Sequence, residues 1–196
     1  MATALASSRD VTLTVCYDIY VDGSCDHGHA IGAAAEISPV GAAVEVCRRV
    51  LGRRGYFVGP GACEVLSILL GYRTYRFFLS SLSEDVRQTL EFTMHTDSSH
   101  SLLYLNGFTP TDPAGSKLLP LIDLLREERR RHPELEVRKC SSTENRAHRS
   151  ALKAMRAARD GRDNVVFAST EWMQFDDVLL AALNEVEART TIVHSV

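Results

Sequence analysis

The sequence predicts an α/β fold in which five strands are flanked by helices, with a helical extension at the C-terminus. Three observations predict this class. Apolar residues make up 45% of the 196 residues, enough for a full core and too many for extensive disorder. Three strand-like segments come first, and helix-like and strand-like patterns then alternate. A membrane-spanning helix is excluded because no run of about 18 apolar residues occurs. We expect a domain over residues 1–159 and the extension over 160–196.

The first three strands are expected at residues 12–22, 32–37 and 42–51, which are dense in β-branched and apolar side chains. Glycine, serine and proline residues separate them. The first strand is expected to end at Asp22, directly before Gly23. Because the turns are short, the three strands most simply form an antiparallel meander.

The remaining elements follow from a change of period after residue 61, where apolar residues begin to recur at helical spacing. A helix is therefore expected first, and Pro133 stops a later amphipathic helix. The expected elements are a helix at 62–77, a strand at 89–96, a short helix at 99–105, a loop at 107–116, a helix at 117–131, a strand at 134–139, a helix at 143–159, a short extended segment at 165–169 and a helix at about 175–188.

Three sequence motifs carry acidic residues at the ends of these elements. They read YDIYVDGSC at 17–25, CEVLSILLGY at 63–72 and HTDSS at 95–99. Together, and in this order, they resemble the ribonuclease H family, in which one strand ends in Asp-Gly-Ser, a helix opens with Glu, and a later strand ends in Thr-Asp-Ser. The resemblance covers about residues 11–158. It implies a sheet of three antiparallel strands followed by parallel strands joined by helices.

The resemblance implies that Asp22, Glu64 and Asp97 are catalytic metal ligands for two Mg²⁺ or Mn²⁺ ions. Two divalent ions about 4 Å apart activate water and stabilise a departing oxygen in phosphodiester hydrolysis. Oxygen ligands suit Mg²⁺, and carboxylates this close would repel one another without a metal. Taken singly, each residue has a simpler explanation, because aspartates commonly cap turns and a glutamate is favoured in the first turn of a helix.

The fourth expected ligand is His148. In the family a late helix opens with Asn-Glu-x-Ala-Asp, and residues 144–149 (ENRAHR) place His148 where the final Asp would stand. Neutral imidazole coordinates Mn²⁺ better than Mg²⁺. We therefore expect His148 to be a weaker catalytic metal ligand. The alternative is that His148 is a partly buried polar residue in a fold that has lost catalysis.

Two further departures from the family pattern bear on the substrate. The asparagine that usually precedes the helical Glu is absent, since residues 60–63 read PGAC, and residues 137–141 lack the catalytic-loop histidine. The RNA strand of an RNA/DNA hybrid is still the substrate that the resemblance implies, with slowed turnover and a less strict hybrid preference. The alternatives are a degenerate module that binds nucleic acid or a protein without cutting, and a nuclease acting on structured DNA or single-stranded RNA.

The charge of the chain is strongly polarised. The net charge is −3, yet residues 126–162 carry 12 of the 22 basic residues against six acidic ones, a local net of +6. Within this stretch several cations recur at helical spacing or just before the helix, and we expect them to contact nucleic-acid phosphates. They are Arg138, Lys139, Arg146, Arg149 and Lys153. The simpler alternative for them is a solvated helix face.

The five cysteines indicate a compartment rather than a site. They are odd in number and scattered, with no Cys-x-x-Cys pair, which argues against a zinc ribbon and against a disulfide framework. We expect a reducing intracellular compartment, cytoplasm or nucleus, with no membrane partner. A protein partner could bind through the C-terminal extension.

Overall fold

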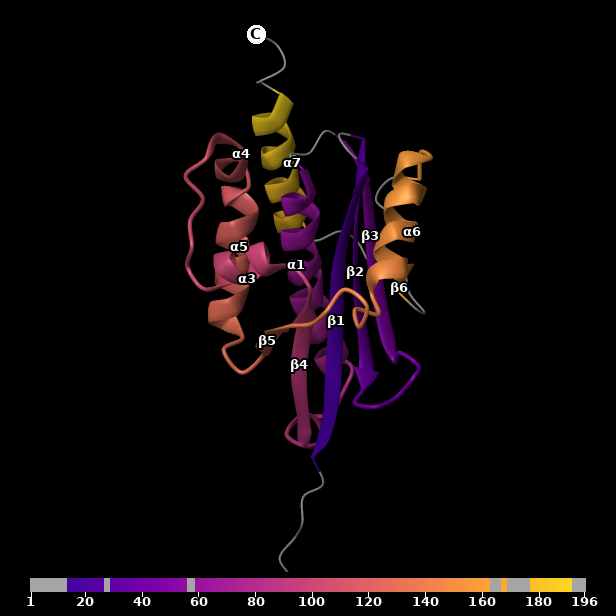
Figure 1. Cartoon of the computed structure of the whole chain (residues 1–196). Coiled ribbons are helices and arrows are strands. Elements are labelled where there is room, and N and C mark those ends of the chain that lie inside the picture. The colour runs from indigo at the N-terminus through magenta and orange to yellow at the C-terminus, as the bar shows by residue number, and fades with distance from the viewer. Residues whose placement is uncertain (1–13, 27–28, 56–58, 163–166, 169–176, 192–196) are drawn as a thin grey trace, which may run out of the picture.

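A twisted sheet with helices on both faces forms the body of the protein (Figure 1). The computed structural model describes residues 14–26, 29–55, 59–162, 167–168 and 177–191. Helices α1 and α5 lie on one side of the sheet together with α7, and α6 covers the other side. None of the described helices is both long enough and apolar enough to cross a membrane.

The sheet has the strand order β5-β4-β1-β2-β3-β6. β1 pairs antiparallel with β2, and β2 with β3, whereas β1, β4 and β5 run parallel. The expected sheet of three antiparallel strands followed by parallel strands is therefore confirmed, and a two-residue β6 adds to its edge beside β3. The strands are β1 (Val15–Asp26), β2 (Ala30–Pro39), β3 (Cys47–Arg54), β4 (Leu90–Thr96), β5 (Glu136–Lys139) and β6 (Phe167–Ala168).

The helices connect these strands, and three of them are short. The four long ones are α1 (Gly59–Ser80), α5 (Leu119–Arg131), α6 (His148–Arg159) and α7 (Asp177–Thr191). The short ones are α2 (Glu84–Arg87), α3 (Ser99–Leu105) and α4 (Pro113–Ser116). Helix α4 lies in the segment expected to be a loop, where the Asp112 side chain accepts a hydrogen bond from the Gly115 amide and caps it.

The main core lies between the sheet and the helices α1, α5 and α7. Its large, fully buried side chains include Ile19, Leu66, Leu69, Met94 and Leu121. Leu183 and Val186 of α7 belong to the same cluster, so the last helix packs on the core. The opposite face is lined by small residues, and α6 approaches the sheet closely there: a Cβ on Gly32 of β2 would lie 2.3 Å from the Ala151 carbonyl oxygen.

Most element boundaries differ by a few residues from the sequence-based expectation, and the contacts explain three of these differences. β1 continues four residues past Asp22, because its pairing with β2 extends to Asp26 opposite Ala30. β3 starts at Cys47 rather than at residue 42, since the preceding residues form the hairpin connection. α6 starts at His148 rather than at 143, because Glu144 accepts hydrogen bonds from the Ser141 amide and hydroxyl and holds a turn there. Of the expected extended segment 165–169 the structure describes residues 167–168, and of the expected helix 175–188 it describes residues 177–188. The rest of both lies outside the described residues.

Candidate active site

Three carboxylates that are far apart in the sequence meet beside β1. Asp22, Glu64 and Asp97 each offer one oxygen, and these oxygens all lie within 4.8 Å of one another. Asp22 lies within β1, Glu64 near the start of α1, and Asp97 directly after β4. Because β1 and β4 are adjacent parallel strands, residues near the same end of both come together at one place.

Gly23 explains how α1 brings Glu64 so close to Asp22. A Cβ at Gly23 would lie 2.5 Å from the carbonyl carbon of Cys63 and 2.7 Å from the amide nitrogen of Glu64. Only a residue without a side chain lets the helix backbone approach the strand at this point. The Asp-Gly pair therefore places one ligand on the strand and admits the helix that carries the next.

The three carboxylates form a crowded, partly desolvated group of negative charge. Burial and the neighbouring Asp97 raise the pKa of Asp22 to about 6, against the opposing effect of the hydrogen bond from His148. Burial, followed by Asp22 and Asp97, raises the pKa of Glu64 to about 8. The Glu64 Oε2 atom is buried and has no hydrogen-bond partner among the residues that the structure describes.

These features fit a divalent cation. An oxygen-only donor set with an unpartnered carboxylate oxygen suits Mg²⁺ or Mn²⁺. A cation among the three groups would also remove the repulsion that raises the pKa of Asp22 and Glu64. In the described part of the chain, these three carboxylates are the one group of three or more Asp, Glu, His or Cys side chains whose ligand atoms lie this close together.

His148 adjoins this group through Asp22. Its Nδ1 atom lies 2.8 Å from Asp22 Oδ2, and its side chain is 58% exposed. The imidazole thus contacts one carboxylate of the cluster from the first turn of α6, on the side open to solvent. The structure brings Asp22, Glu64 and Asp97 together, and it places His148 beside Asp22.

Asn145 is a site residue that the sequence reasoning missed. It is 5% exposed, and its Nδ2 donates to the Val21 carbonyl (3.0 Å) and to Asp97 Oδ1 (3.2 Å). Its Oδ1 accepts a hydrogen bond from the Ala147 amide (3.3 Å). The side chain therefore links β1, Asp97 and the residues just before α6. The signal in the sequence is the order Glu-Asn at 144–145, where the family motif has Asn-Glu.

The five expected phosphate contacts differ in how far they are already engaged. Arg149 and Lys153 are exposed on α6 and have neither an ion pair nor a hydrogen bond within the described residues. Arg146 donates to the Ala42 carbonyl, and its guanidinium lies 5.4 Å from the Tyr20 ring centre. Arg138 is paired with a neighbouring carboxylate at 2.6 Å, and Lys139 donates to the Ser99 hydroxyl. Two of the five are thus uncommitted.

The sulfur chemistry of the described residues is simple. All five cysteines are free thiols, and Cys63, next to Glu64, is buried. A hydrogen bond with Cys25 and burial raise the pKa of the Cys63 thiol, so this group is protonated at neutral pH. The thiol donates to the Pro60 carbonyl and so helps to hold the first turns of α1.

Comparison with known proteins identifies the fold. No family model matches the chain, and no curated protein matches it in sequence. Solved structures do match. The N-terminal RNase H domain of a Mycobacterium tuberculosis protein, solved as a fusion with maltose-binding protein, aligns with a TM-score of 0.54 at 14% identity, covering 76% of this chain and 96% of that one.

Two further structures give the same result. LC11-RNase H1, solved in complex with an RNA/DNA hybrid, has a TM-score of 0.54 at 14% identity, covering 74% of this chain and 96% of that chain. RNase H1 from the halophilic archaeon Halobacterium salinarum has a TM-score of 0.52 at 14% identity, covering 74% and 98%. The chain therefore has the ribonuclease H-like fold.

Proposed function

We propose that this protein is a metal-dependent nuclease that hydrolyses phosphodiester bonds. The observation that carries the proposal is that Asp22, Glu64 and Asp97 come together in a ribonuclease H-like fold. One buried oxygen of Glu64 has no hydrogen-bond partner in the described part of the chain. A crowded group of carboxylates with raised pKa values is costly for a fold, and a cation-dependent activity gives a reason to keep it.

In this proposal the three carboxylates hold two Mg²⁺ or Mn²⁺ ions, and His148 is the fourth, weaker ligand or orients Asp22. When bound, two such ions supply an activated water nucleophile and neutralise charge on the departing oxygen. The other residues of the chain contribute by positioning these carboxylates. Gly23 lets Glu64 approach, and Asn145 holds Asp97 by a hydrogen bond to Oδ1.

The proposed substrate is the RNA strand of an RNA/DNA hybrid. Support comes from the similar LC11-RNase H1, whose structure contains such a hybrid. Support also comes from Arg149 and Lys153, two exposed cations one turn apart on α6 whose charges are not neutralised by any ion pair in the described part of the chain. Cations of this kind bind phosphates through charge and independently of base sequence.

A second candidate is a binding module that has lost catalysis. His148 favours it, since this residue stands where the family has an aspartate and contacts Asp22 alone among the three carboxylates within the described structure. Such a module would bind nucleic acid through the same cations. It would not cleave with either ion.

Cleavage of end-labelled RNA/DNA hybrid, double-stranded RNA and single-stranded RNA, with Mg²⁺ and with Mn²⁺, separates the two candidates. We expect hybrid cleavage with at least one ion, lost in EDTA and in Asp22→Asn. The matched control is Asp123→Asn, an aspartate of α5 whose side chain is 71% exposed, which should cleave like the unmodified chain. Cleavage that survives Asp22→Asn, or no cleavage with either ion, contradicts the nuclease.

A further inference from the structure

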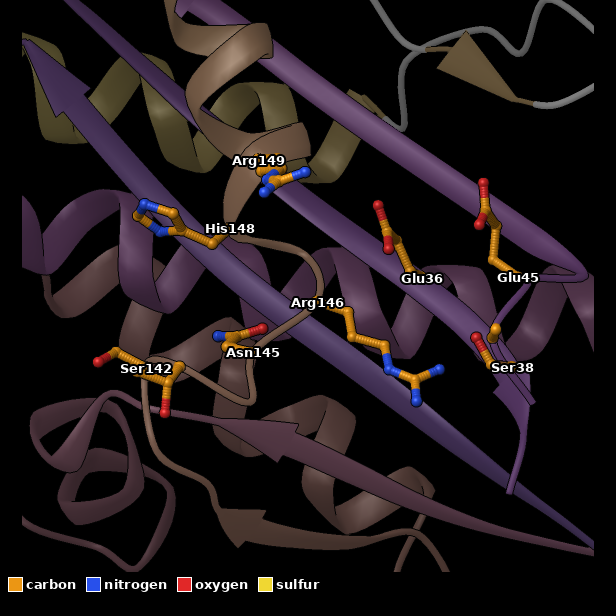
Figure 2. A pocket seen from close by; sticks show the side chains of 10 residues that line it. Glu36, Ser38, Glu45, Ser142, Asn145, Arg146, His148 and Arg149 are labelled. Atoms are coloured by element: carbon orange, nitrogen blue, oxygen red, sulfur yellow. The ribbon is translucent and has the colours of Figure 1, made fainter. Parts of the chain in front are cut away.

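A polar groove opens beside the proposed metal centre, on the face of the sheet that α6 covers (Figure 2). One wall is the end of β2 with the connection to β3, and the other is the segment before α6 with the first turn of that helix. Its volume is about 570 Å³. Sites that hold one small ligand have volumes of roughly 300–1,000 Å³.

The groove begins at the metal centre itself. His148 lines it and also contacts Asp22 at 2.8 Å, and Asn145 lines it and also donates to Asp97. The groove therefore adjoins the carboxylates through these two residues, and a strand with a phosphate at the carboxylates would pass them to reach it.

The two sides of the groove carry opposite charges. Arg146 and Arg149 lie on the side of the segment before α6 and its first turn, whereas Glu36 and Glu45 lie on the hairpin side (Figure 2). Arg149 has no partner within the described residues, which leaves all its donors for a ligand. Glu36 is 8% exposed and accepts a hydrogen bond from Ser150, and Glu45 is paired with Arg48 at 2.7 Å.

This arrangement selects the chemistry of the ligand. Guanidinium groups bind an anion such as phosphate, and carboxylates only accept hydrogen bonds, so they need donors such as sugar hydroxyls or exocyclic amino groups. A free phosphate would bind the arginines but would be repelled by the glutamates on the other wall. A nucleotide carries both groups in one molecule.

One side chain bridges the two walls of the groove. Arg146 donates to the Ala42 carbonyl and so joins the two walls, and its guanidinium is held over the Tyr20 ring. A cavity of about 570 Å³ has the size of sites that hold one small ligand, and a single nucleotide is such a ligand. Because Arg146 joins the two walls, an unpaired nucleotide is the form of nucleic acid that we infer here.

We propose that this groove binds one unpaired nucleotide that follows or precedes the scissile phosphate, with its phosphate at Arg146 and Arg149 and its sugar or base donors at Glu36 and Glu45. The inference rests on the proposed nuclease function for its setting. It defines the substrate class more narrowly, as a strand that is single-stranded on one side of the cut.

The test measures binding without catalysis. The full ¹⁵N-labelled chain in EDTA is titrated with adenosine 5′-monophosphate, adenosine and inorganic phosphate, and amide signals are followed by NMR. We expect the monophosphate to shift signals at 36–45 and 142–149 and to bind more tightly than either fragment. Arg149→Ala should weaken it about tenfold, since a charge-assisted hydrogen bond is lost. Arg130→Ala, an exposed cation of α5 on the other side of the sheet, is the charge-matched control and should leave binding unchanged.

Two further measurements test the specificity. Glu36→Gln should reduce the preference for the monophosphate over inorganic phosphate. A single-stranded RNA tetranucleotide should displace the monophosphate, whereas a blunt RNA/DNA hybrid should not. Equal binding of inorganic phosphate, shifts at another surface, equal displacement by the blunt hybrid, or no binding would each overturn the inference.

The proposed nuclease and this groove fail separately. Because EDTA removes the metal, nucleotide binding is independent of cleavage. Cleavage without nucleotide binding overturns the groove alone, and nucleotide binding without cleavage overturns the nuclease alone.

Discussion

His148 and Asp22 are joined by a 2.8 Å contact between imidazole Nδ1 and carboxylate Oδ2, which ties the start of α6 to β1. The aspartate side chain is 3% exposed and the imidazole 58%. The hydrogen bond favours the charged aspartate, yet the pKa of Asp22 is raised to about 6, because burial and Asp97 outweigh the imidazole. In the absence of metal, His148 therefore offsets only part of the repulsion in the cluster.

Replacing His148 by aspartate should shift the metal preference of the site. A fourth carboxylate adds a hard oxygen ligand, so His148→Asp should bind Mg²⁺ about tenfold more tightly and lose its preference for Mn²⁺. Calorimetric titration with each ion measures this directly. His29→Asp, an exposed histidine of the β1–β2 turn, supplies the same charge change away from the cluster. An unchanged Mg²⁺/Mn²⁺ ratio in His148→Asp would argue that position 148 holds no ligand.

The raised pKa values predict an unusual pH dependence of stability. The pKa of Asp22 is raised from 3.8 to about 6 and that of Glu64 from 4.5 to about 8. Because the folded chain holds these protons more tightly than the unfolded chain, the metal-free protein loses stability as pH rises from about 4 to about 8. The melting temperature in EDTA should therefore fall by about 5 °C or more between pH 5 and pH 9.

Two observations check the origin of this fall. Mn²⁺ at pH 8 should restore the lost stability, since a cation replaces the protons. Glu64→Gln removes one of the two titrating groups, so the melting temperature of this variant in EDTA should change less with pH. A melting temperature in EDTA that rises steadily over this range would contradict the proposed crowding of charge.

The sequence predicted the strand and helix order, and the three carboxylates that meet. These features are local or nearly so. Alternation and helical spacing identify the elements, and each of Asp22, Glu64 and Asp97 stands in a short motif that resembles the family pattern. Their meeting then follows from the strand order that the resemblance implied.

What the sequence did not predict depends on contacts between distant segments. β1 continues past Asp22 because β2 pairs with it as far as Asp26, and no local residue marks that end. Asn145 reaches Val21, which is 124 positions away, so its role is visible only in the folded chain. The groove likewise exists only because the β2–β3 connection and the segment before α6 lie opposite each other.

Gly23→Ala should separate Glu64 from Asp22. The new methyl would meet the Cys63 backbone at 2.5 Å, and backbone cannot rotate away, so α1 must shift. We expect a loss of about 1–3 kcal/mol in the free energy of unfolding and weaker Mn²⁺ binding by the folded protein. Chemical denaturation and metal titration measure the two effects.

Gly52→Ala is the matched control for this substitution. Its Cβ would lie 2.4 Å from the Ala154 carbonyl oxygen, at a similar close approach between a strand and α6. It should cost similar stability while leaving Mn²⁺ affinity unchanged. Equal losses of metal affinity in both variants would mean that the effect reports general loosening.

Asn145→Ala should lower both stability and metal affinity. The buried amide makes three hydrogen bonds, and its loss leaves the Val21 carbonyl and the Ala147 amide without this partner. The expected cost is about 1–3 kcal/mol in the free energy of unfolding. Asn145→Asp keeps the acceptor and puts a carboxylate beside Asp97. Mn²⁺ should therefore raise the melting temperature of this variant above its value in EDTA by more than it does for the unmodified chain. Metal affinity in Asn145→Ala equal to that of the unmodified chain would refute the positioning of Asp97.

Arg149 and Lys153, the two uncommitted cations among the five expected phosphate contacts, predict how nucleic-acid binding depends on salt. Each phosphate that a cation neutralises releases counterions, so the slope of log affinity against log salt measures the number of such contacts. Arg149→Ala and Lys153→Ala should each weaken hybrid binding and make this slope shallower by about 1. Affinities for a hybrid with a single-stranded RNA overhang are measured by fluorescence anisotropy at several salt concentrations in Ca²⁺, to limit cleavage. Arg130→Ala should change neither quantity, because α5 lies on the other side of the sheet. Because neither Arg149 nor Lys153 has an ion pair within the described residues, the double variant should lose about 2 from the slope, and an unchanged slope would remove these two cations from the binding surface.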